Sequence, residues 1–381
     1  MNRLAPSITV AMTLMMGTAV SIPAQPTTVE TSAPSYSAPA IVKARLLKQL
    51  DRPKVPLDPQ VKLVEPTPEG LVVERLSIAT ERKANGKLER VPMLIVRPAD
   101  VSERRPLVIV LHGTGGNKSR EYDWLERLSQ RGMIAMAIDA RYHGERSGGA
   151  KGADAYVAAA TRAWRAKPGE PQEHPFYFDT VWDLWRVLDY ALARPDVDPA
   201  RVAMLGFSMG GIQTWLAASV DDRVGVVVPC IAVQSFRWSL EHDRWQGRAK
   251  TIYDAHLAAA RDLGEPEVDQ RVCRELWTKL LPGILDDLDC PSLLRLFAGR
   301  PMLIVSGELD PNCPLDGAKI AFAEAERAYS DAGASDKLEI DVAEGVPHRV
   351  SAPQEKHVLQ FLERWLGESA PKRPSTEPSA N

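Results

Sequence analysis

A short apolar run that leads into a glycine-rich turn around a serine constrains this chain more than any other stretch. Residues 202–205 have the pattern of a strand buried on both faces, and the sequence GFSMG at 206–210 and a helix-like segment at 212–219 follow. A serine on a sharp turn between strand and helix has a strained backbone, needs glycine neighbours and leaves its hydroxyl exposed. The stretch therefore predicts Ser208 as a nucleophile, with an ordinary Ser-Gly turn as the alternative.

Strand and helix patterns alternate over most of the remaining sequence. Strands are predicted by apolar runs at 107–111, 133–138, 202–205, 224–228 and 302–305, and by a further strand pattern at 338–342. Helices are predicted by periodic apolar residues at 120–131, 178–192, 315–329 and 353–365. Strand-like runs at 71–79 and 88–96, with Asn85-Gly86 between them, predict an antiparallel start. The fold class is therefore α/β, a mostly parallel twisted sheet with helices on both faces.

The two ends of the chain differ from its middle. Residues 1–24 have one early charge, Arg3, and an apolar run before small residues, which predicts a signal peptide and an exported (periplasmic or secreted) protein. The run is short and follows Pro6, so no stable membrane span is expected, with an uncleaved anchor as the alternative. Residues 25–40 and 368–381 have the composition of a disordered linker and tail. The folded domain is expected at 41–367, with a helical insert at about 235–300.

The charge balance and the cysteines bear on the binding partners and on disulfide formation. The 47 basic and 50 acidic side chains nearly balance, which gives no argument for a nucleic-acid partner. Of the four cysteines, Cys273 and Cys290 fall in the insert and could form a disulfide in an exported protein. Free buried thiols are the equal alternative, also for Cys230 and Cys313.

An exposed serine needs a base, and the base needs an orienting carboxylate. Catalytic groups of parallel sheets gather beyond the carboxyl ends of the strands. There the sequence places Asp310, in SGELDP, and His348, in EGVPH, which predicts a triad in the order Ser, Asp, His. Glu308 competes for the acid role, and His357 is the weaker rival for the base.

The sequence HGTGG at 112–116 supplies the remaining part of such a site. A tetrahedral oxyanion needs fixed hydrogen-bond donors, and backbone N–H groups of a glycine-rich loop can approach it closely. We expect these donors to be the N–H groups of Met209, next after the nucleophile, and of Thr114. His112 and His143 also end strands and are expected to shape the pocket or form hydrogen bonds.

The motifs GFSMGG, HGTGG, DARYHGER, GELD and the late PH together resemble the α/β-hydrolase family. Within it they resemble the dienelactone-hydrolase-like, acetyl-xylan-esterase-like and prolyl-oligopeptidase-related serine hydrolases, over about residues 71–366. The resemblance implies Ser208 as nucleophile, His348 as base, Asp310 as acid, and Met209 and Thr114 as oxyanion donors. Dienelactone hydrolases use a cysteine nucleophile, so that substrate is disfavoured. No cofactor or metal is implied, since dinucleotide, P-loop and zinc motifs are absent from the sequence.

The sequence thus predicts a serine hydrolase that cleaves carboxylic esters through an acyl-enzyme. The expected substrate is a small-molecule or saccharide ester, such as a short-chain or acetylated-sugar ester. A peptidase or amidase of the same fold is the alternative, as is a non-catalytic binding protein, which would have no need of an intact triad. The insert is expected to cover the Ser208 pocket. Its Trp238, Trp245, Trp277, Leu240, Ile252 and Leu257 line the pocket or form the insert's own core.

Overall fold

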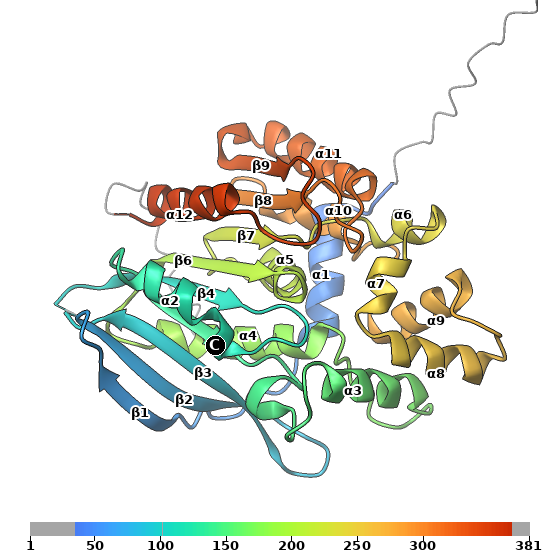
Figure 1. Ribbon diagram of the computed structural model, residues 1–381, viewed down its shortest axis with the longest axis horizontal. Helices are drawn as coiled ribbons and strands as arrows, with labels where there is room; N and C mark the ends of the chain where they lie inside the picture. Colours follow the sequence, from blue (N-terminus) through green and yellow to red (C-terminus); the bar gives the residue numbers. More distant parts are fainter. Residues whose placement is uncertain (1–34, 101, 368–381) are drawn as a thin grey trace, which may run out of the picture. The chain divides into compact units, whose positions relative to one another are not determined.

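A computed structural model describes residues 35–100 and 102–367 of the chain (Figure 1). Among the described residues, those from Tyr36 to Gly367 form one compact unit. The expected signal peptide, most of the expected linker and the expected tail lie outside the described residues, so those predictions stay untested. Within the described residues, no helix is both long and apolar enough to span a membrane.

The described residues form nine strands and twelve α-helices, joined by loops and short 3₁₀ turns. The strands are β1 (Gln60–Pro66), β2 (Leu71–Arg82), β3 (Leu88–Pro98), β4 (Arg105–Leu111), β5 (Ile134–Ile138), β6 (Val197–Phe207), β7 (Val226–Cys230), β8 (Met302–Gly307) and β9 (Leu338–Ala343). The helices are α1 (Pro39–Leu50), α2 (Tyr122–Ser129), α3 (Asp154–Arg165), α4 (Phe178–Leu192), α5 (Met209–Val220), α6 (Phe236–Glu241), α7 (Gln246–Lys250), α8 (Tyr253–Leu263), α9 (Gln270–Leu280), α10 (Cys290–Leu294), α11 (Leu315–Asp331) and α12 (Ala352–Leu366).

The strands form a single sheet in the order β1-β2-β3-β5-β4-β6-β7-β8-β9. The first three strands pair antiparallel, β3 also pairs antiparallel with β5, and every pairing from β5 to β9 is parallel. Successive parallel strands are joined through helices, which return the chain to the same end of the sheet. The predicted α/β class and the antiparallel start are confirmed.

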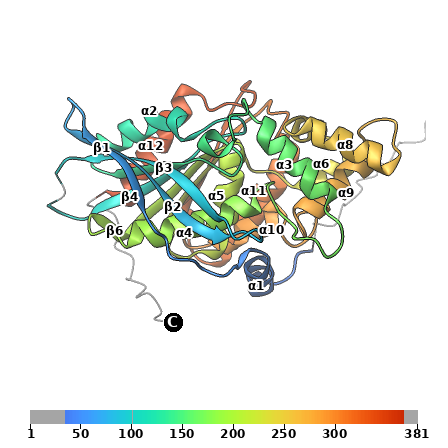
Figure 2. The same ribbon diagram turned by 90° about the horizontal axis from the view of Figure 1, so that it is seen from below.

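Helices cover both faces of this sheet, and the core therefore has two parts. In β4, Leu107 and Ile109 belong to one buried cluster, whereas Val108 and Val110 belong to the other, because successive side chains point to opposite faces. Helices α4 and α5 pack on the first face, with α1 against these two helices, and α2 and α12 pack on the second face, as Figure 2 shows. A strand covered on both faces is apolar at every position, which is why these runs are continuous in the sequence.

The structure adds two elements that the sequence did not predict. All seven residues of β1 are exposed, so its sequence has no apolar alternation to identify it. Helix α3 follows a glycine-rich stretch, and three of its four buried residues are alanines, which give a weak periodic signal. In Figure 1, β1 lies beside β2 at the edge of the sheet, and α3 lies near the β2–β3 hairpin.

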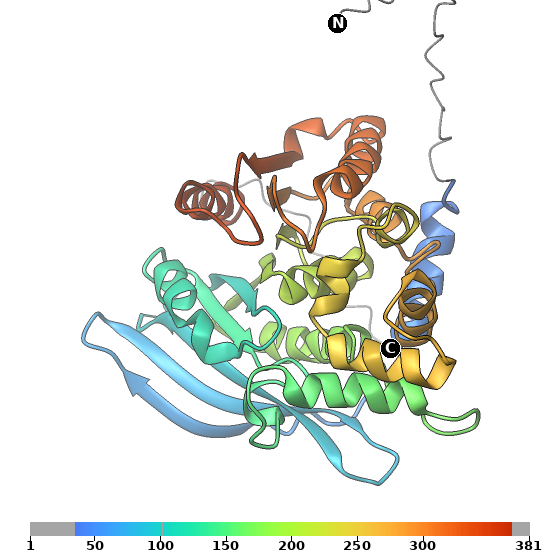
Figure 3. The ribbon, with the colours of Figure 1, turned by 45° about the vertical axis from the view of Figure 1, so that its right-hand side comes forward.

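Between β7 and β8 the expected helical insert forms α6 to α10. In Figure 1 the parallel strands point toward the side on which α6, α7, α8 and α9 lie, and Figure 3 shows α7 beside α5 in front of that edge. The insert is thus placed at the carboxyl edge of the sheet, where the candidate catalytic residues lie.

Candidate active site

Ser208 occupies the turn between β6 and α5 in a conformation that L-residues rarely adopt. Its φ is 52° and its ψ is −113°, and such a backbone costs about 1–3 kcal/mol. The Ser208 N–H donates to the carbonyl oxygen of Cys230 at 2.9 Å, which fixes the turn against the neighbouring strand β7. Ser208 is half-buried.

The two glycines that flank Ser208 are required by close backbone approaches. A Cβ on Gly206 would lie 2.5 Å from Thr214 Oγ1 and would overlap the carbonyl oxygen of Gly210. A Cβ on Gly210 would lie 2.8 Å from the carbonyl oxygen of His112 and would overlap that of Leu111. The turn therefore fits between β4 and α5 only with glycine at both positions, which is the physical content of the G-x-S-x-G pattern.

The structure brings Ser208, Asp310 and His348 together. His348 Nε2 lies 2.8 Å from Ser208 Oγ, and His348 Nδ1 lies 2.7 Å from Asp310 Oδ2. Asp310 follows β8, and His348 lies in the loop between β9 and α12. The two loops touch, because a Cβ on Gly307 would lie 2.5 Å from the carbonyl oxygen of Pro347. Residues 140 positions apart thus form one hydrogen-bonded chain.

Of the two carboxylates that the sequence offered, Asp310 is the one beside His348. It is 3% exposed, and its Oδ1 accepts hydrogen bonds from the N–H groups of Asn312 at 2.8 Å and Cys313 at 3.0 Å. Glu308 is exposed and accepts instead from the Gly345 N–H at 2.7 Å. Asp310 therefore has its second oxygen free for the histidine.

His357, the alternative base, lies on α12 and contacts two carboxylates. Its Nδ1 lies 2.7 Å from Asp341 and its Nε2 lies 2.8 Å from Glu339. Burial lowers the pKa of His357, but its bonds to Asp341 and Glu339 outweigh this and raise it. Both ring nitrogens are occupied, so His357 is a surface ion-pair residue in this arrangement.

The loop that carries Thr114 lies directly against the serine turn. A Cβ on Gly113 would lie 3.5 Å from the Phe207 carbonyl oxygen and 3.6 Å from Ser208 Cβ. Met209 is the first residue of α5, where a backbone N–H has no partner within the helix and the helix dipole is positive. Met209 thus follows Ser208 directly, and the loop 112–116 packs on the serine turn through Gly113; the role of the Met209 and Thr114 N–H groups as oxyanion donors stays a prediction.

His112 and His143 are buried and hold neighbouring loops. His112 Nδ1 lies 2.8 Å from the Gly113 carbonyl oxygen, and His112 Nε2 accepts from the Ala140 N–H at 3.1 Å, which joins the loops after β4 and β5. His143 Nδ1 lies 2.9 Å from the Arg141 carbonyl oxygen. Burial lowers the pKa of both rings, that of His143 to about 4, so both are neutral hydrogen-bonding groups.

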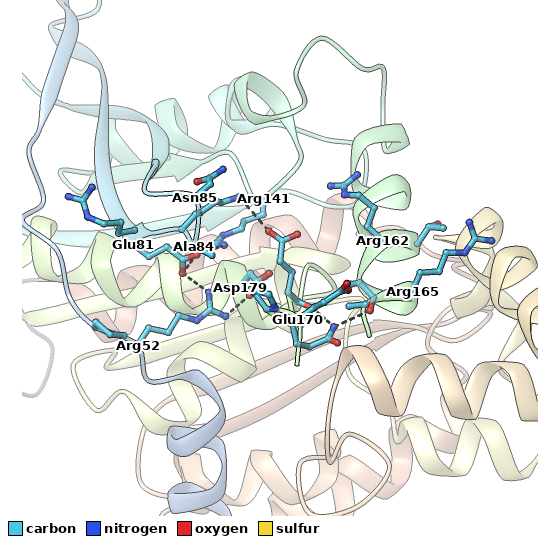
Figure 4. Close-up of a pocket in the computed structure, with 18 of the residues that line it drawn as sticks. Arg52, Glu81, Ala84, Asn85, Arg141, Arg162, Arg165, Glu170 and Asp179 are labelled. Carbon is cyan, nitrogen blue, oxygen red and sulfur yellow. Dashed lines mark hydrogen bonds and ion pairs between the residues drawn. The ribbon is translucent and has the colours of Figure 1, made fainter. Parts of the chain in front are cut away.

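A separate hollow of about 850 Å³ lies between the β2–β3 hairpin, α3 and the start of α4 (Figure 4). Its wall includes Arg52, Glu81, Arg141 and Asp179, which are joined in ion pairs; Arg141 lies 3.1 Å from Glu81, and Arg52 contacts both Glu81 and Asp179. None of the three residues of the Ser-His-Asp chain lines it. Part of the DARYHGER motif therefore serves this ion-pair network.

In the described part of the chain, one group of side chains has metal-ligand spacing. Ligand atoms of Asp310, Cys313 and His348 all lie within 4.8 Å of one another. Two of these residues are hydrogen-bonded to each other. Burial raises the pKa of Cys313 to about 12, so its thiol is protonated at neutral pH and is a poor ligand in that form.

Most of the apolar residues that the sequence singled out in the insert are buried in the insert's own core. Leu240, Ile252 and Trp277 are fully buried, and Trp277 Nε1 donates to His256 Nε2 at 3.0 Å. Trp245 is also buried, which leaves Trp238 and Leu257 as the partly exposed members of the set. The four cysteines are buried free thiols, so the disulfide between Cys273 and Cys290 that the sequence left open does not form in this structure.

The sequence reasoning missed Arg248, a buried arginine of α7. Its Nη2 donates to the Asn312 carbonyl oxygen at 3.1 Å, within the loop that holds Asp310. A single arginine in a helical insert gives no sequence signal, because its burial depends on contacts made by the tertiary fold.

Comparisons with known proteins agree with the fold. A family model for acetyl xylan esterase (AXE1) matches residues 77–237. The curated protein YtaP of Bacillus subtilis (strain 168), whose name assigns it provisionally to the hydrolases, is 24% identical over 294 residues, 73% of this chain and 84% of YtaP.

Solved structures of esterases have the same fold. Acetyl xylan esterase 1 from Thermoanaerobacterium sp. JW/SL YS485 superposes with a TM-score of 0.61 at 20% identity, covering 87% of this chain and 94% of that one. A glucuronoyl esterase from Solibacter usitatus gives 0.57 at 16% identity, covering 88% and 99%. The predicted resemblance to α/β-hydrolases of the esterase type is confirmed, and the comparisons support a hydrolase that acts on esters.

Proposed function

We propose that this chain, an α/β-hydrolase similar to carbohydrate esterases, cleaves carboxylic esters through an acyl-enzyme formed on Ser208. The hydrogen-bonded chain from Ser208 Oγ through His348 to Asp310, with distances of 2.8 and 2.7 Å, carries the proposal. A nucleophile, a base and an orienting carboxylate, hydrogen-bonded in this order, are the groups that form and break an acyl-serine.

In the proposed reaction His348 is the proton carrier. Its Nε2 takes the Ser208 proton as Oγ attacks the ester carbonyl, and returns it to the leaving alcohol. Asp310 keeps the proton of the neutral ring on Nδ1 and stabilises the imidazolium that forms. Water then attacks the acyl-serine by the same steps, and Ser208 leaves with the proton restored.

The N–H groups of Met209 and Thr114 are the proposed oxyanion donors. A donor aimed at the developing negative oxygen contributes about 3 kcal/mol to lowering the barrier. Both donors are backbone groups, held in place by the glycine contacts of the serine turn and of the loop 112–116. Replacing the side chains of Met209 and Thr114 would leave these N–H groups in place. A substitution that moves the backbone of either loop is the better test of their role.

The proposed substrates are short-chain esters, including acetylated saccharides. The family model and the solved acetyl xylan esterase support this class by their names. Most aromatic residues of the insert are buried in its own core. They are therefore not exposed to bind an extended peptide, which favours small ester substrates over peptides. An alkoxide also leaves more readily than an amide nitrogen, which requires full protonation.

Labelling with a fluorophosphonate probe, followed by peptide mapping, tests the nucleophile. We expect modification of Ser208, and we expect Ser208→Ala to lower kcat by about 10⁴-fold while the unfolding transition stays in place. Modification of a different serine, or near-native turnover by the alanine variant, would remove Ser208 from this role.

A substrate panel tests the class. We expect hydrolysis of p-nitrophenyl acetate and acetylated xylose, with peptide amides at least about 10³-fold slower in kcat/KM, a difference of roughly 4 kcal/mol. Rapid cleavage of peptides with no turnover of short esters would favour a peptidase of the same fold instead.

Export of the chain is a further part of the proposal. It rests on residues 1–24, whose single early charge and apolar run have the pattern of a signal peptide. Mass measurement of the protein from cell fractions tests it: a processed chain outside the cytoplasm is expected. Full-length protein confined to the cytoplasm would contradict it.

A further inference from the structure

The guanidinium of Arg248 is buried beside the loop that holds Asp310. The residue is 1% exposed, and its side chain reaches from α7 in the insert to that loop. Nη2 donates to the Asn312 carbonyl oxygen at 3.1 Å and lies 3.1 Å from Cys313 Sγ. Burying a cation costs free energy, and the Asn312 carbonyl and the Cys313 thiol carry no charge to offset that cost. The burial of Arg248 therefore requires an explanation.

The charge of Arg248 is maintained by its surroundings. Burial lowers the pKa of Arg248, but Tyr177, Cys313 and Asp310 outweigh this and raise it. Asp310 acts on it through space, since the Asp310 oxygens bond to His348 and to two backbone N–H groups. The guanidinium carbon also lies 5.7 Å from the centre of the Phe236 ring, which faces it from α6.

Residues 311–313 form a loop that contacts Arg248 on one side and Asp310 on the other. The N–H groups of Asn312 and Cys313 donate to Asp310 Oδ1, while the carbonyl of Asn312 accepts from Arg248. The Cys313 thiol donates to the Ile231 carbonyl at 3.3 Å, at the end of β7. Helix α7 lies directly against the loop, because a Cβ on Gly247 would lie 3.0 Å from the Asn312 N and would overlap the Pro311 carbonyl.

We propose that Arg248 is a positioning residue, which fixes the loop 311–313 and thereby the direction in which Asp310 presents its carboxylate to His348. The insert is then a support of the catalytic acid as well as a cover of the pocket. The inference rests on the proposed Ser-His-Asp mechanism and adds to it a residue that does not touch the substrate.

Replacement of Arg248 by glutamine tests the proposal. We expect Arg248→Gln to lower kcat for p-nitrophenyl acetate by about 10²-fold, the effect of a small displacement of a catalytic group, with KM changed less than about threefold. Arg248→Lys keeps the charge with a single nitrogen, and we expect it to restore part of kcat. Arg244→Gln removes an exposed arginine of the same insert and serves as the matched control, with unchanged kcat.

A spectroscopic readout separates positioning from general loss of structure. The proton between His348 Nδ1 and Asp310 gives a downfield proton NMR signal, which we expect to shift or broaden in Arg248→Gln and to stay in place in Arg244→Gln. This signal needs no turnover, so it tests the inference even if the ester substrates prove wrong. A wild-type enzyme without esterase activity would instead count against the proposed function.

A folded Arg248→Gln variant with wild-type kcat and an unmoved downfield signal would overturn the inference. If that variant does not fold, Gly247→Ala decides, because its Cβ presses on the Pro311 carbonyl and displaces the loop from the same side. We expect a decrease in kcat of at least about tenfold for it. A folded Gly247→Ala variant with wild-type kcat would equally overturn the role of α7.

Discussion

Asp289 predicts a specific dependence of stability on pH. The carboxyl group is fully buried between α6 and α10, and it accepts hydrogen bonds from Ser235 Oγ at 2.6 Å and from the Phe236 and Cys290 N–H groups at 2.8 Å. Burial raises the pKa of Asp289 from 3.8 to about 7, although these hydrogen bonds lower it in part. We expect replacement by asparagine to remove this titration.

The direction and the size of the pH effect on the free energy of unfolding follow from the raised pKa of Asp289. Between about pH 4 and pH 7 the folded chain keeps a proton on Asp289 that the unfolded chain has lost, so stability falls as pH rises through this window. A shift of about three units corresponds to roughly 4 kcal/mol, fully lost above about pH 7. The wild type should therefore lose up to this amount relative to Asp289→Asn between pH 4 and pH 8.

Urea unfolding followed by tryptophan fluorescence measures the difference. The free energies of unfolding of wild type and Asp289→Asn are compared at each pH, so that all other titrating groups cancel. A difference that stays constant between pH 4 and pH 8 would refute the raised pKa. A difference that changes in the opposite direction would show that the hydrogen bonds dominate over burial and hold Asp289 ionised.

Four further substitutions have expected outcomes. Asp310→Asn should lower kcat by about 10⁴-fold through the wrong imidazole tautomer, whereas Glu308→Gln should leave it nearly unchanged; steady-state kinetics would show the reverse ranking if Glu308 were the acid. Gly210→Ala should reduce kcat and Tm together, because its Cβ overlaps the Leu111 carbonyl, and a fully active variant with wild-type Tm would contradict the close approach. Leu46→Ala on α1 should cost about 2–5 kcal/mol in urea unfolding, and a cost below about 1 kcal/mol would mean that α1 is not packed as described.

The sequence predicted those parts of the fold that depend on local pattern. Helix α4 begins and ends where its apolar periodicity does, at Phe178 and Leu192, and the parallel strands other than the edge strand β9 contain continuous apolar runs. The turn around Ser208 was recognisable because its glycines are required by backbone contacts between neighbours in sequence and in the adjacent strand. Strand β1 could not be recognised, since an exposed edge strand has no buried face to impose a pattern.

The candidate site was predicted in outline and completed by the tertiary structure. Both Asp310 and Glu308 follow the same strand, and the choice between them depends on which side chain turns toward His348, a property of the loop and not of residue type. Arg248 lay beyond prediction for a similar reason, because an arginine is usually exposed and its burial here results from the packing of α7 on that loop.

Helix α1 has a consequence for the order in which the chain can fold. Its apolar side chains Val42, Leu46 and Leu50 are fully buried, and the helix packs against α4, α5 and α10. Synthesis proceeds from the amino end, so α1 emerges before these partners, and α10 at Cys290–Leu294 emerges some 240 residues after it. Until then the docking site of this apolar face is incomplete, so the first helix of the described residues is among the last to reach its final position.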